Sequence, residues 1–518
     1  MAKLLTSGQM READRRTIEE LGLPGMVLME NAGQGVVQAI KTHLPDWPKR
    51  RLLVLAGTGN NGGDGFVVAR RLLQDGLSTS VFLFGTAASL KGDAATNHQV
   101  YLRLGGRVHE VVQPEDLNRL GSRLNHVGIV VDAIFGTGLM RPITGLIATA
   151  IHQVNASGKP VFAVDIPSGI NTDTGQVMGT AIQAQWTVTF AAEKIGHRLY
   201  PGASHCGAII PVEIGIPACY LEIPQHDVAR NRMDDLVIPK RPRDSHKGNF
   251  GHLFIIAGSV GKEGAAALTA LGAHSVGPGW ITVATPGIAQ PTVAAKLLEA
   301  MTLPLPDDGI AGIDTAALTT LRNHPVHPAA LAVGPGLGTG DGTTAVVVGL
   351  LDHWRDIPMV IDADGLNAIA HSNQNTLFTH RTAATVLTPH PGEMSRLTGQ
   401  SVAMIQADRL TAARSLAMNL ASWVVLKGAD SVIAAPDGRI WINETGNSGL
   451  AAGGSGDVLT GVIAGLLAQG WPVESAVRAG VFIHGAAAEA AATAMGGPVG
   501  LKAGELPSFI RSAINGLG

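Results

Sequence analysis

The sequence has few cysteines, few aromatic residues and no long hydrophobic run. Its two cysteines, Cys206 and Cys219, are too few for a disulfide framework and have no C-x-x-C or Cys/His metal-ligand spacing. The first residues turn polar before the apolar core of a signal peptide could form, and no uncharged apolar run is long enough to cross a bilayer. These absences predict a soluble protein of the reducing cytoplasm.

Charge is also scarce and nearly balanced. Charged residues make up 15% of the chain and the formal net charge is −3, so bulk electrostatics gives no reason to expect nucleic acid or an anionic membrane as a partner. Glycine is abundant instead, with 66 residues in a chain of 518 that is 45% apolar. This composition favours an α/β protein with many strand-to-helix turns, and the length favours two domains.

The most informative stretch runs from Asn447 to Asp457, N-S-G-L-A-A-G-G-S-G-D, and continues into an apolar helix. Its glycines leave backbone N–H groups uncovered, and a helix starting near Asp457 directs its positive end to the same place. This arrangement predicts an anion hole in which Asp457 could accept a proton from a substrate hydroxyl beside a phosphoryl group in transit. The alternative is a glycine-rich turn in which Asp457 only caps the helix.

A second glycine-rich stretch lies near the N-terminus. A buried strand over 51–56 runs into G-T-G-N-N-G-G-D-G at 57–65, and a helix is expected over 66–75. In a doubly wound sheet such a loop lies at the carboxyl edge, where the backbone can approach a pyrophosphate. Many α/β turns are glycine-rich with nothing bound, but a plain turn does not need the Asn-Asn and Asp of this loop.

Two later strands end in carboxylates. Strand 128–131 is followed by Asp132, and strand 161–164 is followed by Asp165 and then Ser168. Parallel neighbouring strands would bring these side chains and Asn61 to one rim of hard oxygen ligands around an anionic substrate. Each aspartate alone is better explained as a helix or turn cap, but three loops with the same placement favour a site.

Together, G-x-G-N-N-G-G-D-G, D-A-x-F-G-T-G and D-I-P-S-G resemble the YjeF N-terminal family, the NAD(P)HX epimerases, over about residues 1–220. The resemblance implies a Rossmann-like domain that interconverts the two C6 epimers of hydrated NADH or NADPH. It implies K⁺ ligands at Asn61, Asp132 and Ser168. It also implies substrate contacts at Asn60, Asn61, Gly62, Gly63, Asp64, Gly136, Thr137, Gly138, Leu139, Met140, Arg141, Pro142 and Asp165.

Epimerisation at the carbon that carries the hydroxyl requires that bond, or the ring, to open and close again. We expect Asp165 to be the catalytic acid–base group, with a pKa raised by a dehydrated pocket. Lys194 stands where the family usually has K-P-G, and Ile195 replaces the proline of that motif.

Prolines and mixed charges gather between residues 216 and 242, where the strand pattern stops, and a new buried strand follows at 253–257. We therefore expect an N-terminal domain over 1–220, a linker over 221–234 and a second domain over 235–518.

The stretch around Asp457 resembles the G-x-G-D signature of ribokinase-like small-molecule kinases. With K-G-N-F-G-H, G-P-G-L-G, D-A-D-G-L-N, T-P-H-P-G-E and K-G-A-D, it is similar to the ADP-dependent NAD(P)HX dehydratases over about residues 235–515. The resemblance implies contacts to hydrated NAD(P)H from Ala265, Gly338, His390 and Asp457. It implies that the adenine nucleotide is held by Lys427, Gly428, Ala429, Asp430, Ser431 and Gly456.

The implied reaction is the ADP-driven dehydration of the S epimer to NADH or NADPH, which yields AMP and phosphate. Mg²⁺ is expected beside the phosphates, with no ligand that the sequence identifies. Asp362 and Asp364 follow a further strand, and turn capping explains them as well as a role in binding does. Taken by itself, His390, which lies between two prolines, cannot be told apart from the many histidines on protein surfaces.

The two halves complement each other, because one would equilibrate the R and S epimers and the other would consume S. The expected partners are NADHX or NADPHX and ADP, in a homo-oligomer. The alternative is a ribokinase-like vitamin-precursor or sugar kinase with a nonenzymatic N-terminal binding module.

Overall fold

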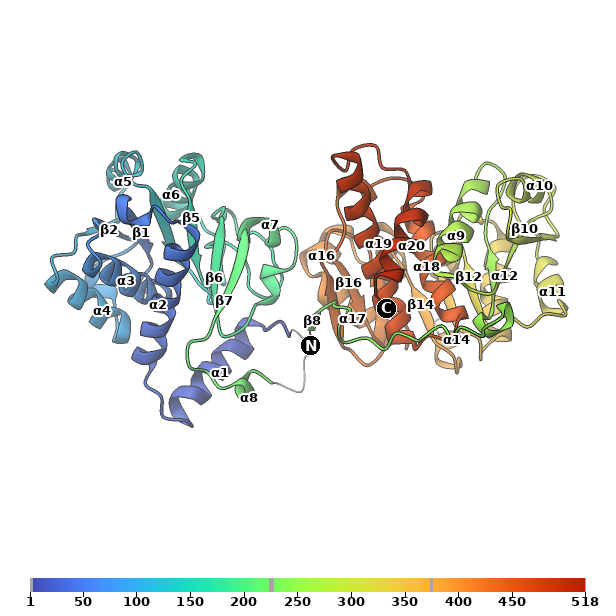
Figure 1. The fold of residues 1–518 in the computed structure, drawn as a ribbon, viewed down its shortest axis with the longest axis horizontal. Coiled ribbons are helices and arrows are strands. Elements are labelled where there is room, and N and C mark those ends of the chain that lie inside the picture. The colour runs from blue at the N-terminus through green and yellow to red at the C-terminus, as the bar shows by residue number, and fades with distance from the viewer. Residues whose placement is uncertain (1–2, 223–227, 373–375, 518) are drawn as a thin grey trace. The chain divides into compact units, whose positions relative to one another are not determined.

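The computed structural model of the chain describes residues 3–222, 228–372 and 376–517. The contacts divide the chain into two compact units that meet in sequence between Val228 and Ala229. We call Lys3–Val228 the N-terminal unit and the residues from Ala229 onward the C-terminal unit. Each contains a sheet with helices around it (Figure 1). None of the helices in the three described ranges combines the length and the apolar character that a membrane span requires.

A seven-stranded sheet forms the centre of the N-terminal unit. Its strand order is β3-β2-β1-β4-β5-β6-β7, and all its pairings are parallel. The strands are β1 (Leu52–Ala56), β2 (Thr79–Leu83), β3 (Val108–Glu110), β4 (Ile129–Ala133), β5 (Val161–Val164), β6 (Trp186–Phe190) and β7 (Ala208–Val212). The helices are α1 (Ser7–Glu19), α2 (Gly25–His43), α3 (Asn60–Gln74), α4 (Gly92–Arg103), α5 (Asp116–Leu124), α6 (Gly145–Ala156), α7 (Ala203–Cys206) and α8 (Ala218–Leu221).

Both faces of this sheet are buried. Val54 of β1 belongs to a core that it shares with α2, α3 and α4, whereas Leu53 and Leu55 belong to a core that they share with α5 and α6. Successive side chains of a strand point to opposite faces, so a strand between two helical layers must be apolar throughout. This is why β1 reads as a continuous run of leucine, valine and alanine.

The C-terminal unit has a ten-stranded sheet of order β11-β10-β9-β12-β13-β14-β15-β16-β17-β8. Its pairings are parallel from β11 to β15 and antiparallel from β15 to β17. The strands are β8 (Val228–Arg230), β9 (His252–Ile256), β10 (Trp280–Pro286), β11 (Met301–Leu305), β12 (Ala330–Val333), β13 (Met359–Ile361), β14 (Thr385–Leu387), β15 (Trp423–Leu426), β16 (Ser431–Ala434) and β17 (Ile440–Asn443).

Four helices, α9, α18, α19 and α20, share one hydrophobic core with this sheet (Figure 1). The contact between α9 and α18 is close because Gly461 has no side chain: a Cβ there would lie 1.9 Å from the carbonyl oxygen of Thr269. The helices of the unit are α9 (Glu263–Val276), α10 (Gln290–Ala294), α11 (Ala317–Arg322), α12 (Asp341–His353), α13 (Asp364–Ser372), α14 (Thr376–Thr379), α15 (Pro391–Thr398), α16 (Val402–Ala407), α17 (Arg409–Asn419), α18 (Ser455–Ala468), α19 (Val473–Met495) and α20 (Leu506–Asn515).

In both sheets the strand order reverses beside the first parallel strand. The reversal falls between β1 and β4 in the N-terminal unit and between β9 and β12 in the C-terminal unit. Ligands of doubly wound proteins bind outside the carboxyl ends of the strands at such a switch point. The predicted α/β class with largely parallel sheets is confirmed, and its topology locates one candidate site in each unit.

The helix expected over 66–75 begins earlier, at Asn60, so this part of the prediction is wrong. Glycines normally disfavour a helix by about 1 kcal/mol each relative to alanine. Here they permit close packing instead, because a Cβ on Gly62 would lie 1.9 Å from the carbonyl oxygen of Gly57, and one on Gly63 would lie 2.6 Å from the Cε atom of Met29. The predicted glycine loop is therefore mostly the first turns of α3.

The predicted linker over 221–234 contains a strand that the sequence does not signal. This strand, β8, lies beside β17 at the edge of the second sheet. Asn231 follows it and continues the attachment, because its backbone N–H donates to the carbonyl oxygen of Ile442 at 2.8 Å. Its side-chain amide donates to the carbonyl oxygen of Arg478 at 2.9 Å. Short strands of mixed composition gain their conformation from such pairing rather than from local propensity.

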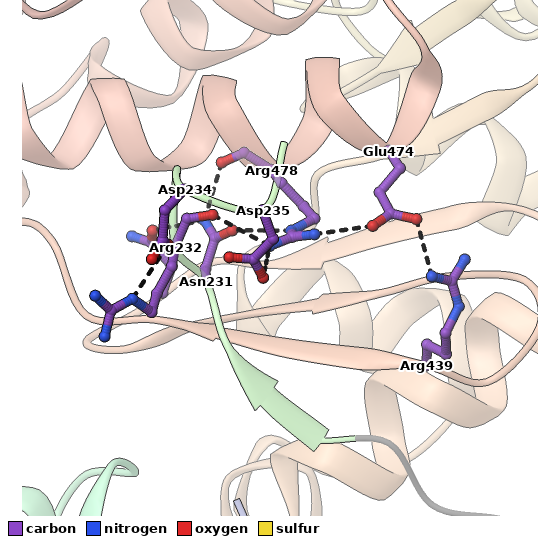
Figure 2. Close-up of polar contacts among 8 residues, drawn as sticks. Asn231, Arg232, Asp234, Asp235, Arg439, Glu474 and Arg478 are labelled. Carbon is purple, nitrogen blue, oxygen red and sulfur yellow. Dashed lines mark hydrogen bonds and ion pairs between the residues drawn. The ribbon is translucent and has the colours of Figure 1, made fainter. Parts of the chain in front are cut away.

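Arg478 of α19 holds this segment in place (Figure 2). The side chain is fully buried, and its guanidinium donates to Glu474 at 2.8 Å, to Asn231 at 3.2 Å and to Asp235 at 3.3 Å. The same group lies 4.8 Å from the ring centroid of Trp441. A buried arginine with its donors occupied and its charge balanced is a stable arrangement, whereas the loss of one partner is costly.

Candidate active sites

A cavity of about 530 Å³ opens at the switch point of the N-terminal sheet. Its wall includes residues that follow β1 and β4, together with Asp165, which follows β5. The side of the cavity near β1 is formed by the start of α3, whose N-cap, Gly59, provides no side-chain hydrogen bond. The first N–H groups of this helix are therefore available to an anion. The predicted contacts that line the cavity are Asn60, Asn61, Asp64, Gly136, Thr137, Gly138, Leu139 and Asp165.

The other predicted contacts lie outside the cavity wall. Gly62 and Gly63 are buried behind the helix start. Met140, Arg141 and Pro142 are exposed, and Met140 has 77% of its surface open to solvent. The structure therefore brings the polar residues of the first predicted loop to the cavity together with the first half of the second loop, and it leaves the end of the second loop outside.

Asp165 is held by Lys194, which is fully buried. Lys194 Nζ donates to Asp165 Oδ1, to Thr189 Oγ1 at 2.8 Å and to the carbonyl oxygen of Phe190 at 3.0 Å. Thr189 Oγ1 in turn donates to Asp165 Oδ1 at 3.1 Å. None of the hydrogen bonds found in the described ranges involves Oδ2, the second oxygen of this cavity-lining carboxylate. The site thus fixes one oxygen of Asp165 and leaves the other for a ligand.

The raised pKa that we expected for Asp165 is wrong. Burial pushes the pKa upward, but the charge and hydrogen bond of the Lys194 ammonium outweigh burial and hold the pKa below its ordinary value. Asp165 also has φ of 67°, a left-handed backbone conformation that non-glycine residues adopt infrequently. Asp165 is therefore ionised at neutral pH and is suited to accept a proton.

His197 is hydrogen-bonded to the backbone of both Lys194 and Asp165. Its Nδ1 accepts from the backbone N–H of Lys194 at 3.0 Å, so its Nε2 carries the proton and donates to the carbonyl oxygen of Asp165 at 2.9 Å. Burial lowers the pKa of His197 to about 4, and the Lys194 charge adds to this effect. The ring is neutral and fixes the backbone at Asp165.

The predicted K⁺ ligands form a second, buried cluster. Asp132 is part of β4 rather than the residue after it, and it is fully buried. Ser168 donates to it twice, from Oγ to Oδ1 at 2.6 Å and from the backbone N–H to Oδ2 at 2.7 Å. Burial raises the pKa of Asp132 to about 6, although these hydrogen bonds oppose the shift. Asn61 Nδ2 is buried without a hydrogen-bond partner among the described residues.

Three charged residues that line this cavity, Arg11 and Asp14 of α1 and Asp93 of α4, were not among the predicted contacts. Arg11 and Asp14 of α1 line the same wall as Asp64 and Asp165. The polar face of α1 has the usual composition of a solvated surface, and no motif in the sequence marks it as part of a site. The only available signal was their i,i+3 spacing, which places both side chains on one face.

The second site lies at the start of α18 in the C-terminal unit. The N-cap of this helix, Gly454, has φ of 91° and provides no side-chain hydrogen bond. The N–H of Ser455 donates to the carbonyl oxygen of Ala452 at 3.3 Å, and the N–H groups of Gly456 and Asp457 remain available to an anion, as predicted for the glycine stretch. Asp457 lies in the first turn. A Cβ on Gly456 would lie 3.3 Å from Lys427 Nζ, which places the lysine directly beside this turn.

Asp362 joins Lys427 to α18. Lys427 Nζ donates to Asp362 Oδ1 at 2.7 Å, and Thr460 Oγ1 donates to Asp362 Oδ2 at 2.8 Å. Glu393 Oε2 lies 3.9 Å from the same ammonium. Burial opposes the lysine charge, but Asp362 and Glu393 outweigh burial and raise the pKa of Lys427. The sequence left Asp362 undecided, and the structure makes it the centre of the polar network.

This network changes the acidity of Asp457. Burial raises the pKa of Asp457 to about 7, and the negative charge of Asp362 contributes to the shift, while Lys427 opposes it. A carboxyl group with this pKa exchanges a proton readily at neutral pH, which suits a general base. Asp457 thus combines the acidity and the position required to activate a hydroxyl beside an anion.

The predicted substrate contacts Ala265, Gly338 and His390 lie in three separate segments of this unit: α9, the loop after β12 and the start of α15. Gly338 donates its N–H to Asp364 Oδ2 at 2.8 Å, and Lys262 Nζ donates to the same oxygen at 3.0 Å. Ala265 lies against Gly336, where a Cβ would approach it to 2.9 Å. His390 caps α15: its Nδ1 accepts from the N–H of Gly392 at 3.0 Å, and its Nε2 lies 3.4 Å from Glu393 Oε1 in a side chain that is 51% exposed.

The predicted nucleotide-binding residues 427–431 comprise the turn between β15 and β16 and the first residue of β16, Ser431. The backbone N–H of Lys427 donates to the carbonyl oxygen of Pro389 at 2.9 Å, which joins this turn to the loop of His390. Ser431 Oγ donates to the carbonyl oxygen of Gly428 at 3.1 Å. The buried Arg409 donates to the carbonyl oxygens of Ala429 and Leu426, and these hydrogen bonds fix the backbone conformation of the turn.

Comparison with known proteins follows the same division into two units. Residues 25–196 match the family described as YjeF-related protein N-terminus, and residues 253–510 match the family described as NAD(P)H-hydrate dehydratase. The Bifunctional NAD(P)H-hydrate repair enzyme Nnr of Moorella thermoacetica is 41% identical over 518 residues, which cover 99% of this chain and 97% of that enzyme. The protein of the same name from Thermofilum pendens is 39% identical, with coverage of 99% and 97%.

A solved structure of the ADP/ATP-dependent NAD(P)H-hydrate dehydratase from Bacillus subtilis, co-crystallized with ATP/Mg²⁺, is 33% identical to this chain. The match covers 54% of this chain and 95% of the Bacillus subtilis chain, with a TM-score of 0.48.

Proposed function

Because the chain belongs to the bifunctional NAD(P)H-hydrate repair enzymes, we propose that its two units perform the two reactions of that repair. The N-terminal unit epimerises R- and S-NAD(P)HX. The C-terminal unit dehydrates the S epimer to NADH or NADPH at the expense of ADP and yields AMP and phosphate. The observation that carries the proposal is Asp457, a carboxyl with a pKa of about 7 at an uncapped helix start.

The proposed dehydration begins with a poor leaving group. Asp457 takes the proton from the C6 hydroxyl, and the oxygen attacks the β-phosphorus of ADP while AMP departs. The start of α18 receives the negative charge of the transferring phosphoryl group on its N–H groups. The C6–O bond then breaks with release of phosphate, and loss of a proton from C5 restores the C5=C6 double bond.

Lys427 and the turn 427–431 are proposed to hold the adenine nucleotide. Lys427 is suited to a phosphate because Asp362 and Glu393 keep it protonated, and Asp362 fixes its position relative to α18. We further propose that Ala265, Gly338 and His390 contact hydrated NAD(P)H. Gly338 is hydrogen-bonded to Asp364, whose charge acts on Asp457, and His390 lies in the loop that is hydrogen-bonded to Lys427, which supports this proposal.

Mg²⁺ fits the chemistry of this site. Glu393 is buried beside Lys427, and burial raises its pKa, with a further contribution from the charge of Asp362. The site therefore has more negative charge than its lysine balances. Mg²⁺ typically binds one or two carboxylates together with substrate phosphates, and Glu393 is the carboxylate that we propose for it.

K⁺ fits the buried cluster of the N-terminal unit. Asp132 carries a charge that no cationic side chain in the described ranges balances, and Ser168 and Asn61 add neutral oxygen atoms. Turning the Asn61 amide would place its oxygen at the buried position that now lacks a partner. If K⁺ binds there, replacement of K⁺ by Na⁺ slows epimerisation but not dehydration, and equal rates in both salts would disprove the assignment.

The direct test uses pure protein with hydrated NADH and ADP. Recovery of NADH absorbance together with AMP is the expected result. Formation of a phosphorylated product without NADH would identify a kinase instead. Incubation of the R epimer separates the units, because only a chain that also epimerises converts it fully to NADH.

A further inference from the structure

One face of α1 forms part of the cavity wall in the N-terminal unit. Arg11, Asp14 and Ile18 all line the cavity, and their i, i+3, i+7 spacing places them on one side of the helix. The adjoining side of α1 is buried, with Met10 and Ala13 among its least exposed residues. The helix is therefore packed from behind and presents a polar edge to the cavity.

The start of α1 is attached to the segment that contains Lys194. The backbone N–H of Leu5 donates to the carbonyl oxygen of Glu193 at 3.0 Å, and that of Ile195 donates to the carbonyl oxygen of Leu5 at 3.2 Å. Ser7 donates to Asp173 from its backbone at 2.6 Å and from its hydroxyl at 2.9 Å. Since Lys194 holds Asp165, these contacts also fix α1 relative to that carboxylate.

The carboxyl group of Asp14 has no hydrogen bond or ion pair within the described ranges, although arginines lie nearby in the sequence. Arg15 is occupied by Glu12 at 2.7 Å and by Glu19 at 2.8 Å on the outer surface. Asp14 itself is half-buried at the cavity wall. An ionisable group without a protein partner, in a ligand cavity, is available to the ligand.

We propose that Asp14 is a second catalytic carboxyl of the epimerisation, which gives a proton to the departing C6 hydroxyl while ionised Asp165 deprotonates the incoming water. The inference rests on the proposed function of the N-terminal unit. The two groups come from different parts of the cavity wall, Asp14 from α1 and Asp165 from the end of β5.

The step balances without a further reactant. The C6–O bond breaks with its electron pair on oxygen, the oxygen takes the Asp14 proton and leaves as water, and the N1 lone pair forms N1=C6. Water then attacks the other face of C6, the electron pair returns to N1, and Asp165 takes the proton of the attacking water. Exchange with solvent restores both carboxyl groups, or the reverse reaction uses them in the opposite roles.

The acidities of the two groups agree with these roles. Burial raises the pKa of Asp14 to about 6, with a further contribution from the charge of Asp165, whereas Lys194 holds the pKa of Asp165 below its ordinary value. The charged and titratable groups around the cavity are Arg11 and Asp14 of α1, Asp64 of α3, Asp93 of α4, Asp165, and Lys194 and His197 behind it.

The test compares full-length wild type with Asp14→Asn and with Glu12→Gln, a control at an exposed position of the same helix. Without nucleotide the dehydratase is idle, so conversion of pure S-NADHX to the R epimer can be followed by chromatography. Asp14→Asn is expected to lower kcat by about 100-fold or more with little change in KM, the usual contribution of a general acid. Glu12→Gln is expected to remain at the wild-type rate.

The pH profile gives a readout that a structural role would not move. In wild type, kcat/KM of epimerisation is expected to fall as pH rises above about 6, because Asp14 loses its proton. This fall disappears in Asp14→Asn. A rate within about threefold of wild type, or a fall above the same pH in the variant, overturns the proposal.

Two measurements distinguish a loss of folding from a loss of the catalytic acid: thermal unfolding of the N-terminal unit, and the rate of Asp14→Glu, which keeps the carboxyl group. If Asp14→Asn unfolds more easily, recovery of at least about tenfold in rate by Asp14→Glu supports the acid role, and no recovery overturns it. If wild type itself does not interconvert the epimers, the proposed function fails rather than the role of Asp14 within it.

Discussion

Replacement of Arg478 by methionine tests how the C-terminal unit holds its first strand. Methionine keeps much of the side-chain volume and removes the guanidinium. Glu474, Asp235 and Asn231 then lose a donor that lies within 3.3 Å of each (Figure 2). Glu474 retains a second partner, Arg439, at 2.9 Å, whereas Asp235 loses its ion pair.

The expected cost follows from burial. Arg478 is fully buried, and removal of one partner from a buried ion pair usually destabilises a protein by about 3–5 kcal/mol. Loss of the contact with the Trp441 ring, 4.8 Å away, adds to this. Arg439→Met is the matched control, because its side chain is 36% exposed and pairs with the same Glu474. Exposed pairs of this kind contribute about 0–1 kcal/mol.

The assay is chemical unfolding of the full-length chain, with hydrogen exchange read separately on peptides from β8 and α19 and on peptides from the N-terminal sheet. Arg478→Met should lower the free energy of unfolding of the C-terminal unit by at least about 3 kcal/mol and leave the N-terminal sheet unchanged. A loss no larger than that of Arg439→Met would show that the buried guanidinium does not fasten this segment.

Two further predictions concern the sites. The kcat/KM for regeneration of NADH from the S epimer should fall about tenfold per pH unit below pH 7. The reason is that Asp457, whose pKa is about 7, must be ionised to accept the hydroxyl proton. A pH–rate profile that is flat down to about pH 5 would contradict this prediction. Gly62→Ala should destabilise the N-terminal unit by about 1–3 kcal/mol in denaturant unfolding, because the new Cβ would lie 1.9 Å from the carbonyl oxygen of Gly57. Gly59→Ala is the control, since a Cβ at Gly59 has no atom within 4 Å. Equal stability of the two variants would refute the packing argument.

Much of the architecture could be predicted because local patterns and the rules for parallel sheets agree. Apolar strands that carry Asp132 near the end of β4 and Asp165 directly after β5 place oxygen atoms at one sheet edge, and the observed register shows that β1 and β4 end together. The position of Asp457 in the first turn of a helix could be predicted for a similar reason. A glycine run before an apolar helix indicates a helix start without a side-chain cap, whatever the surrounding structure.

The remaining features depend on contacts between distant residues. The low pKa of Asp165 is due to Lys194, 29 residues away in sequence, and a burial argument alone gives the wrong sign. The early start of α3 depends on what each glycine touches, and β8 exists because β17 and Arg478 hold it. Asp14 belongs to a cavity that only tertiary structure creates.

The central claim is tested most directly by Asp457→Asn in the full-length chain, with S-NADHX and ADP supplied and both NADH and AMP measured. The account predicts that formation of both products falls together by about 100-fold or more, while the S and R epimers still interconvert at the wild-type rate. Undiminished recovery of NADH with AMP would contradict it.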